Sequence, residues 1–122
     1  KELLKFHESH KMDATVTAVR PPSRFGELQI DNNNTVLNLE EKPQMGKGLI
    51  NGGFFILNKN VLSHLSIKED CDFEFGPLQE ISNSGQLKAY IHHGFWQCMD
   101  NIRERDYLDN LVKNNNAPWL IW

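Results

Sequence analysis

The feature that most constrains the fold is a short, continuous apolar run at residues 54–57, directly after Asn51-Gly52-Gly53. A strand that is apolar at successive positions needs cover on both faces, which is typical of central strands in α/β sheets. We therefore predict a central strand over residues 49–57. The chain around it should supply both neighbouring strands and helices that cover the sheet.

Strand and helix patterns interleave on both sides of this run. Alternating or β-branched segments predict strands at residues 14–19, 27–30, 35–39, 87–91 and 95–99. Apolar spacing predicts helices at residues 1–10, 61–65, 77–84 and 102–112. The Asp-Asn-Asn-Asn segment at 31–34 predicts a hairpin turn. The interleaved order of predicted strands and helices favours an α/β fold, with a mixed sheet and flanking helices.

Composition narrows the class of protein. The chain has 122 residues, 39% of them hydrophobic and 24% charged, which predicts one globular domain or part of one. No apolar run approaches the roughly 20 residues of a membrane span. The net charge of −3 argues against a broad nucleic-acid-binding face. Cys71 and Cys98 lack the spacing of a zinc site, and Cys98 is expected to be a buried thiol in a reducing, cytoplasmic compartment.

Asp100 follows the predicted strand at 95–99 without a spacer. Ligands of open α/β sheets bind beyond the carboxyl ends of strands, and a carboxylate there can hold Mg²⁺. The alternative is that Asp100 caps the next helix. Asn101 and Glu104 already have the spacing of a capping box, so the helix start does not require Asp100. This weakens the capping alternative without removing it.

Two further stretches are candidate ligand sites. In Glu41-Lys42-Pro43, proline restricts Lys42 to extended conformations, and its ammonium could pair with a phosphate while Glu41 accepts hydroxyl hydrogen bonds. Spacing alone favours the alternative, a solvated hairpin end. In Asn51-Gly52-Gly53, the glycines would allow a ligand close to the backbone, or they mark a bulge at a strand end.

Some polar residues have simpler expectations. His7 and His10 share one helix face and could bind a metal, but an exposed helix face is favoured. Asn60 is expected to cap the helix at 61–65. Pro77 suits the first turn of its helix, and Gly85 suits the exit from it.

The stretches ATVTAVRPPSRFG, LEEKP, INGGFF, GFWQCMDN and APWLIW, in this order, resemble the sugar-phosphate nucleotidyltransferases. The resemblance spans essentially the whole chain, and RPPSRFG, FWQCMD and APW resemble its cytidylyl branch. It implies a Rossmann-like nucleotide-diphospho-sugar transferase fold. Residues 1–122 would form a single partial domain, the C-terminal, sugar-phosphate-binding part. The Gly-rich nucleotide-binding part would be absent, and the piece alone would be inactive.

The resemblance also implies an activity: CTP and α-D-glucose 1-phosphate would give CDP-glucose and pyrophosphate, for dideoxysugar and O-antigen synthesis. Lys42 would bind the sugar phosphate as a catalytic residue, Glu41 would bind sugar hydroxyls, and Asn51 and Gly52 would line the sugar pocket. Asp100 would hold Mg²⁺, and the protein would be a homo-oligomer. A sibling enzyme using another nucleotide is one alternative. A non-catalytic sugar-phosphate-binding or assembly module is the other.

Overall fold

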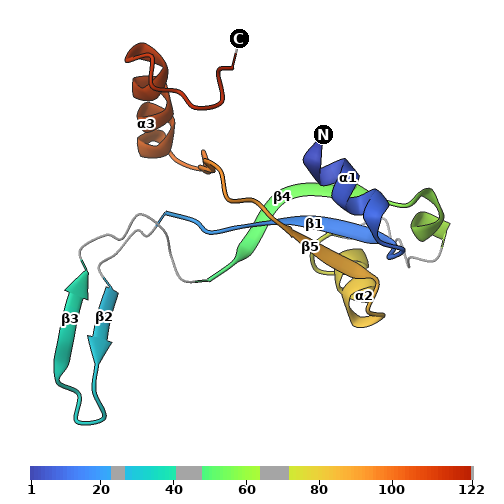
Figure 1. Cartoon of the computed structure of the whole chain (residues 1–122), viewed down its shortest axis with the longest axis horizontal. Coiled ribbons are helices and arrows are strands. Elements are labelled where there is room, and N and C mark those ends of the chain that lie inside the picture. The colour runs from blue at the N-terminus through green and yellow to red at the C-terminus, as the bar shows by residue number, and fades with distance from the viewer. Residues whose placement is uncertain (23–26, 41–47, 64–71, 122) are drawn as a thin grey trace. The chain divides into compact units, whose positions relative to one another are not determined.

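The computed structural model describes the whole chain except residues 23–26, 41–47, 64–71 and 122 (Figure 1). The chain divides into two compact units, Lys1–Val19 with Ile50–His92 and Arg20–Leu49 with His93–Trp122. None of the helices within the described residues has the length and apolar character needed to cross a membrane. The predicted α/β class with a mixed sheet is confirmed.

The first unit is built on a three-stranded sheet of order β4-β1-β5. The central strand β1 (Ala14–Val19) pairs antiparallel with β4 (Ile50–Leu57) and parallel with β5 (Leu87–Ile91). The prediction of a central strand at 49–57 is therefore wrong within the described sheet, where β4 lies at the edge and Phe54 is 72% exposed. A continuous apolar run indicates a need for cover, but it does not specify which strand receives a neighbour on each side.

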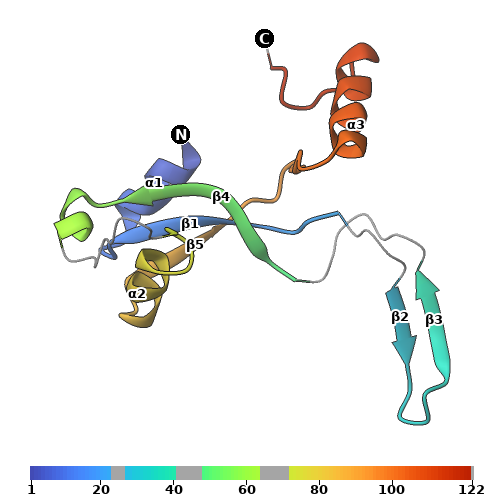
Figure 2. The same cartoon turned by 180° about the vertical axis from the view of Figure 1, so that it is seen from behind.

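Helices lie on both faces of this sheet (Figure 2). The helix α1 (Glu2–Ser9) lies over one face, and α2 (Pro77–Asn83) lies on the other with the short 3₁₀ helix η1 (Lys59–Ser63). Pro77 occupies the first turn of α2, as predicted. Because η1 begins one residue before Asn60, the prediction that Asn60 caps a helix is wrong.

The core follows from the two-residue period of β1. Successive side chains of a strand point to opposite faces, so Ala14 and Thr15 face different layers. On the Ala14 face, a small apolar cluster joins β1, η1 and α2; its members are Ala14, Val61 and Ile81, with Leu57 and Leu87 packed against them. Gly85, with a φ of +72°, ends α2 in the left-handed conformation that glycine adopts without strain.

The Thr15 face holds a closed ring of hydrogen bonds under α1. Thr15 Oγ1 lies 2.8 Å from both His7 Nδ1 and His10 Nε2, and His7 Nε2 lies 3.0 Å from Asn58 Oδ1. The backbone of Met12 closes the ring, because its N–H donates to His10 Nδ1 and its carbonyl accepts from Asn58 Nδ2. His7 is only 7% exposed, so the predicted exposed histidine face is wrong. The i, i+3 spacing identified a shared face but not the strand beneath it.

The second unit contains a hairpin of β2 (Glu27–Ile30) and β3 (Val36–Glu40). The predicted turn between them is confirmed. The Asp31 carboxylate accepts the Thr35 N–H at 2.9 Å, and Asn34 has a φ of 64°. Asparagine tolerates this left-handed conformation better than most residues do, which explains its use in the turn.

The remainder of the second unit departs from the prediction at residues 95–99. These residues form no strand in the structure, and Met99 is 63% exposed. Phe95 instead lies against Trp119, with the ring centroids 5.3 Å apart. Cys98 is half-buried, so the expectation of a buried thiol is only partly met. The apolar sequence predicted burial in a sheet, whereas part of its apolar surface packs in an aromatic contact. The last helix is α3 (Ile102–Lys113).

Candidate functional site

The first candidate site is a bulge in β4. Opposite β1, Val16 pairs with Phe55 and Ala18 pairs with Asn51, so residues 52–54 of β4 face Thr17 alone. Asn51 Oδ1 accepts the Gly53 N–H at 2.9 Å, which closes a tight local turn. The bulge reading of Asn51-Gly52-Gly53 therefore holds. Bulges are common next to active sites, where they re-aim a side chain, so a bulge at this position is compatible with a sugar pocket.

The two glycines of the bulge are required for different reasons. A Cβ atom added to Gly52 would lie 2.8 Å from Val19 Cγ1 and 3.0 Å from the carbonyl oxygen of Thr17. Gly52 is therefore needed because β4 passes close to β1. A Cβ atom added to Gly53 would have no neighbour within 4 Å, but Gly53 has a φ of +90°, which residues with a side chain rarely adopt.

Asn51 also has a partner that the sequence did not indicate. Its Nδ2 donates to Glu74 Oε1 at 2.8 Å. Glu74 lies 23 residues further along the chain and belongs to no motif, so only the folded structure brings it to the bulge. Asn51 and Glu74 are both exposed to solvent, which leaves their remaining polar atoms accessible to a ligand.

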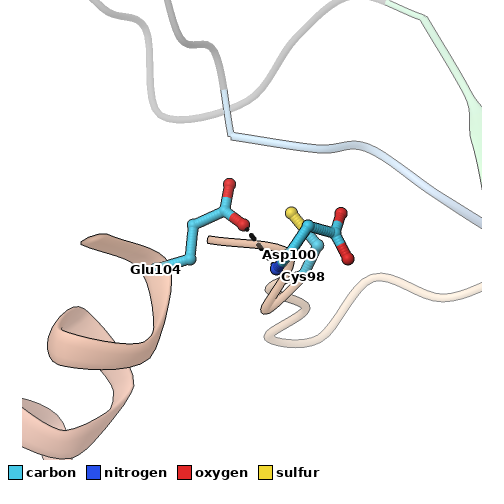
Figure 3. Close-up of side chains that lie close together, drawn as sticks. All are labelled: Cys98, Asp100 and Glu104. Carbon is cyan, nitrogen blue, oxygen red and sulfur yellow. Dashed lines mark hydrogen bonds between the residues drawn. The ribbon is translucent and has the colours of Figure 1, made fainter. Parts of the chain in front are cut away.

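The second candidate site lies at the start of α3. Asn101 Oδ1 accepts the Glu104 N–H at 3.0 Å, so Asn101 caps the helix as predicted. In the predicted capping box, the Glu104 carboxylate would accept the Asn101 N–H. Instead, Glu104 Oε2 accepts the N–H of Asp100 at 2.8 Å (Figure 3). Asp100 thus takes part in the cap through its backbone N–H. The Asp100 carboxylate takes part in neither of these two bonds.

Three potential metal ligands gather at this helix start. One side-chain ligand atom from each of Cys98, Asp100 and Glu104 lies within 4.8 Å of the others (Figure 3). Mg²⁺ prefers oxygen ligands and keeps several waters, so the exposed Asp100 carboxylate suits it, with Glu104 as a second oxygen source. The Cys98 thiol is a soft ligand that suits Mg²⁺ poorly. The residues present therefore fit Mg²⁺, and Glu104 is the member that the sequence assigned only to capping.

The remaining predicted site residues have a different status. Glu41 and Lys42 lie outside the described residues. Asn51 and Gly52 belong to the first unit, and Asp100 belongs to the second. The structure therefore brings Asn51 together with Glu74, and Asp100 together with Glu104, as two separate local arrangements.

Comparison with known proteins assigns the chain to a family. Residues 1–102 match the family model of the nucleotidyl transferases. The chain is 40% identical over 122 residues to glucose-1-phosphate cytidylyltransferase of Salmonella typhi, spanning all of this chain and 47% of that protein. It is 33% identical over 114 residues to the mannose-1-phosphate guanylyltransferase catalytic subunit beta of Drosophila melanogaster, spanning 91% of this chain and 30% of that protein.

A solved structure agrees with these sequence matches. The crystal structure of HddC from Yersinia pseudotuberculosis aligns with a TM-score of 0.55 and 25% identity, over 88% of this chain and 48% of that one. The predicted resemblance and its fold are thus confirmed. The further prediction, that the chain is the C-terminal part of that fold, is contradicted by the alignment with the homologues. The chain spans about half the length of the Salmonella typhi enzyme and of HddC, and 30% of the Drosophila melanogaster protein.

Proposed function

Because the chain belongs to the nucleotidyl transferase family, we propose that the protein makes CDP-glucose and pyrophosphate from CTP and α-D-glucose 1-phosphate. The observation that carries this proposal is the 40% identity, over the whole chain, to a glucose-1-phosphate cytidylyltransferase. In such a reaction, a phosphate oxygen of the sugar phosphate attacks the α-phosphorus of the nucleotide, and pyrophosphate leaves. Catalysis of phosphoryl transfer consists mainly of positioning and charge neutralisation.

In this proposal, Lys42 binds the phosphate of glucose 1-phosphate. A lysine ammonium is a compact point charge that suits a phosphate dianion. It would lower the repulsion between that dianion and the triphosphate and hold the attacking oxygen in place. Glu41, beside it, would accept hydrogen bonds from sugar hydroxyls. Both roles come from the resemblance of the LEEKP stretch to the family.

Asn51 and Gly52 form the sugar-facing wall in this proposal. The bulge of β4 exposes the amide of Asn51, and Gly52 carries no side chain that would stand between a ligand and the backbone. An amide offers both a donor and an acceptor, so it can meet a hydroxyl in either role. The packing of Gly52 on Val19 keeps this wall against the central strand.

Asp100 would hold Mg²⁺, with Glu104 close enough to contribute a second oxygen. A bound Mg²⁺ would supply charge neutralisation between the two substrates' phosphates. The chain's own part is to present the Asp100 carboxylate next to a helix start where Asn101 accepts the N–H of Glu104 and Glu104 accepts the N–H of Asp100. The carboxylate therefore does not have to leave a capping bond to bind a cation.

The experiment that tests the proposal is a substrate panel on the full-length protein. Glucose 1-phosphate is offered with each of CTP, UTP, dTTP, GTP and ATP in the presence of Mg²⁺, and pyrophosphate release is measured. The proposal expects CTP to give the highest kcat/KM and CDP-glucose as the product. A preference for another nucleotide would support the sibling enzyme. Binding of glucose 1-phosphate without turnover with any nucleotide would support the non-catalytic module.

We further propose that CDP-glucose from this reaction feeds dideoxysugar synthesis for cell-surface polysaccharide. We also propose that the enzyme acts in the cytoplasm as a homo-oligomer. These proposals follow from the resemblance to the cytidylyl branch. Sedimentation of the full-length protein tests the oligomer directly, and a monomer at micromolar concentration would contradict it.

A further inference from the structure

Within the part of the chain that the structure describes, the side-chain amide of Asn51 makes two hydrogen bonds. Its Oδ1 accepts the N–H of Gly53 at 2.9 Å, and its Nδ2 donates to Glu74 Oε1 at 2.8 Å. A primary amide has two N–H donors and two oxygen lone pairs. One N–H and one lone pair of Asn51 therefore remain after these two bonds.

The two internal bonds permit only one orientation of the amide. The Gly53 N–H can only donate, and an ionised Glu74 carboxylate can only accept. Rotating the amide of Asn51 by 180° would place oxygen against the carboxylate and nitrogen against the N–H, which would lose both bonds. The remaining donor and acceptor of Asn51 are therefore fixed in their order along β4.

Glu74 is held by the chain around it. Its own N–H donates to Asp72 Oδ1 at 3.1 Å. The ring of Phe73 packs edge-on against Phe55 of β4 at 5.4 Å, and the Phe73 carbonyl accepts the N–H of Leu78 in α2 at 3.0 Å. The segment that carries Glu74 is thus attached both to the strand that bears Asn51 and to the helix that follows.

We infer that Glu74 is a positioning residue of the sugar pocket, which orders the Asn51 amide so that its free N–H and its free lone pair meet two neighbouring hydroxyls of a hexose 1-phosphate. This inference rests on the proposed function, because it takes Asn51 to face the sugar. Glu74 acts through Asn51, so it governs binding of the sugar phosphate and has no direct role toward the nucleotide. A fixed donor–acceptor order also discriminates between sugars whose hydroxyls present a different geometry.

The test is steady-state kinetics of the full-length protein, with Glu74→Ala, Glu74→Gln, Asn51→Ala and the double variant of both alanine changes. A hydrogen bond to a charged group favours the arrangement that contains it by about a tenfold factor or more. We expect Glu74→Ala to raise the KM for glucose 1-phosphate about tenfold and to leave the KM for CTP unchanged. Glu74→Gln keeps an acceptor oxygen and should recover part of this loss. Glu8→Ala, an exposed acid on α1 of the same unit, is the matched control and should change neither KM.

The double variant separates positioning from direct contact. If Glu74 acts through Asn51, the double variant should be no worse than Asn51→Ala alone, whereas independent contacts would add. Additive losses, or an unchanged KM for glucose 1-phosphate in both Glu74 variants, would overturn the inference. A wild-type protein that turns over no sugar 1-phosphate would instead overturn the proposed function. Equal thermal midpoints for wild type and Glu74→Gln would show that the kinetic change is not a folding defect.

Discussion

The hydroxyl of Thr15 lies 2.8 Å from Nδ1 of the buried His7 and 2.8 Å from Nε2 of His10, so it joins the two histidines through hydrogen bonds. Because the Met12 N–H donates to His10 Nδ1, a neutral His10 carries its proton on Nε2 and donates to Thr15. Thr15 can then donate to His7 Nδ1, and His7 donates from Nε2 to Asn58. The ring of hydrogen bonds therefore closes with both histidines neutral.

Replacing Thr15 with valine should destabilise the first unit. The change keeps the shape of the side chain but leaves two ring nitrogens without their shared partner, at a cost of about 1–3 kcal/mol for each buried polar group left unpaired. We expect the free energy of unfolding, measured by urea denaturation, to fall by at least about 1 kcal/mol. A fall equal to that of the control below would show that the ring contributes nothing.

Thr17→Val is the matched control. Thr17 lies on the same strand and the same face, is 7% exposed, and its Oγ1 has no hydrogen-bond partner among the described residues. Removing a buried hydroxyl that makes no bond is neutral or stabilising. The pair of variants therefore separates the hydrogen-bond ring from the general effect of a threonine-to-valine change.

The same ring predicts a pH dependence of stability. The pKa of His10 lies below its usual value, first because of its partial burial and then because of the nearby charges of His7 and Lys88. A lowered pKa means that the folded state binds fewer protons than the unfolded state, so stability is fully present above the unfolded pKa of about 6.5 and falls as pH drops below it. Urea midpoints measured from pH 8 to pH 5 should decrease over the acidic part of this range.

His10→Gln tests the origin of this dependence. A glutamine amide can donate to Thr15 in place of His10 Nε2, but it does not titrate. The decrease between pH 6.5 and 5 should therefore become smaller in this variant, since about one titrating group has been removed. An unchanged decrease would assign the effect to other groups.

The two glycines of the β4 bulge should respond differently to alanine. Gly52→Ala forces a Cβ atom to within 2.8 Å of Val19 Cγ1, and overpacking of this kind costs about 1–3 kcal/mol. In Gly53→Ala, the added Cβ atom has no neighbour within 4 Å. The only cost is that of an alanine with a φ of +90°, about 1–2 kcal/mol. Adding Val19→Ala should recover part of the loss caused by Gly52→Ala and none of the loss caused by Gly53→Ala. Equal responses of the two variants to Val19→Ala would contradict the packing explanation.

Lys42→Ala should separate the two substrates. If Lys42 binds the sugar phosphate, the KM for glucose 1-phosphate should rise by about tenfold or more, since a charge-assisted bond is lost, while the KM for CTP changes little. The measurement is steady-state kinetics of the full-length protein with each substrate varied in turn. Equal increases of both KM values would remove Lys42 from the sugar-phosphate role.

Local signals in the sequence predicted much of the fold. The alternating residues of β1, the Asp31 turn, Pro77 at the start of α2 and Gly85 after it are confirmed, because each depends on near neighbours in the chain. The errors arose where long-range contacts decide. The edge position of β4, the contact of the buried His7 with Asn58, and the packing of Phe95 against Trp119 all involve segments that are distant in the sequence.

The candidate site shows the same division. The capping role of Asn101 followed from its spacing to Glu104, and so did the prediction that the helix start does not require the Asp100 carboxylate. Glu74 could not be predicted, because a single acid 23 residues from Asn51 leaves no pattern in the sequence. Nor did the sequence indicate that Glu104 would bond the backbone of Asp100, since the usual capping box predicts the N–H of Asn101.

The proposed role of Asp100 as a Mg²⁺ ligand of a cytidylyl transfer site is tested most directly by one measurement. Turnover of CTP and glucose 1-phosphate is measured against Mg²⁺ concentration for the wild-type protein, Asp100→Asn and Cys98→Ser. We expect Asp100→Asn to keep its thermal midpoint, because the cap uses its backbone N–H, and to need a Mg²⁺ concentration higher by at least about tenfold for any remaining turnover. Cys98→Ser should match the wild type. An Asp100→Asn protein with an unchanged Mg²⁺ dependence and unchanged turnover would contradict the account.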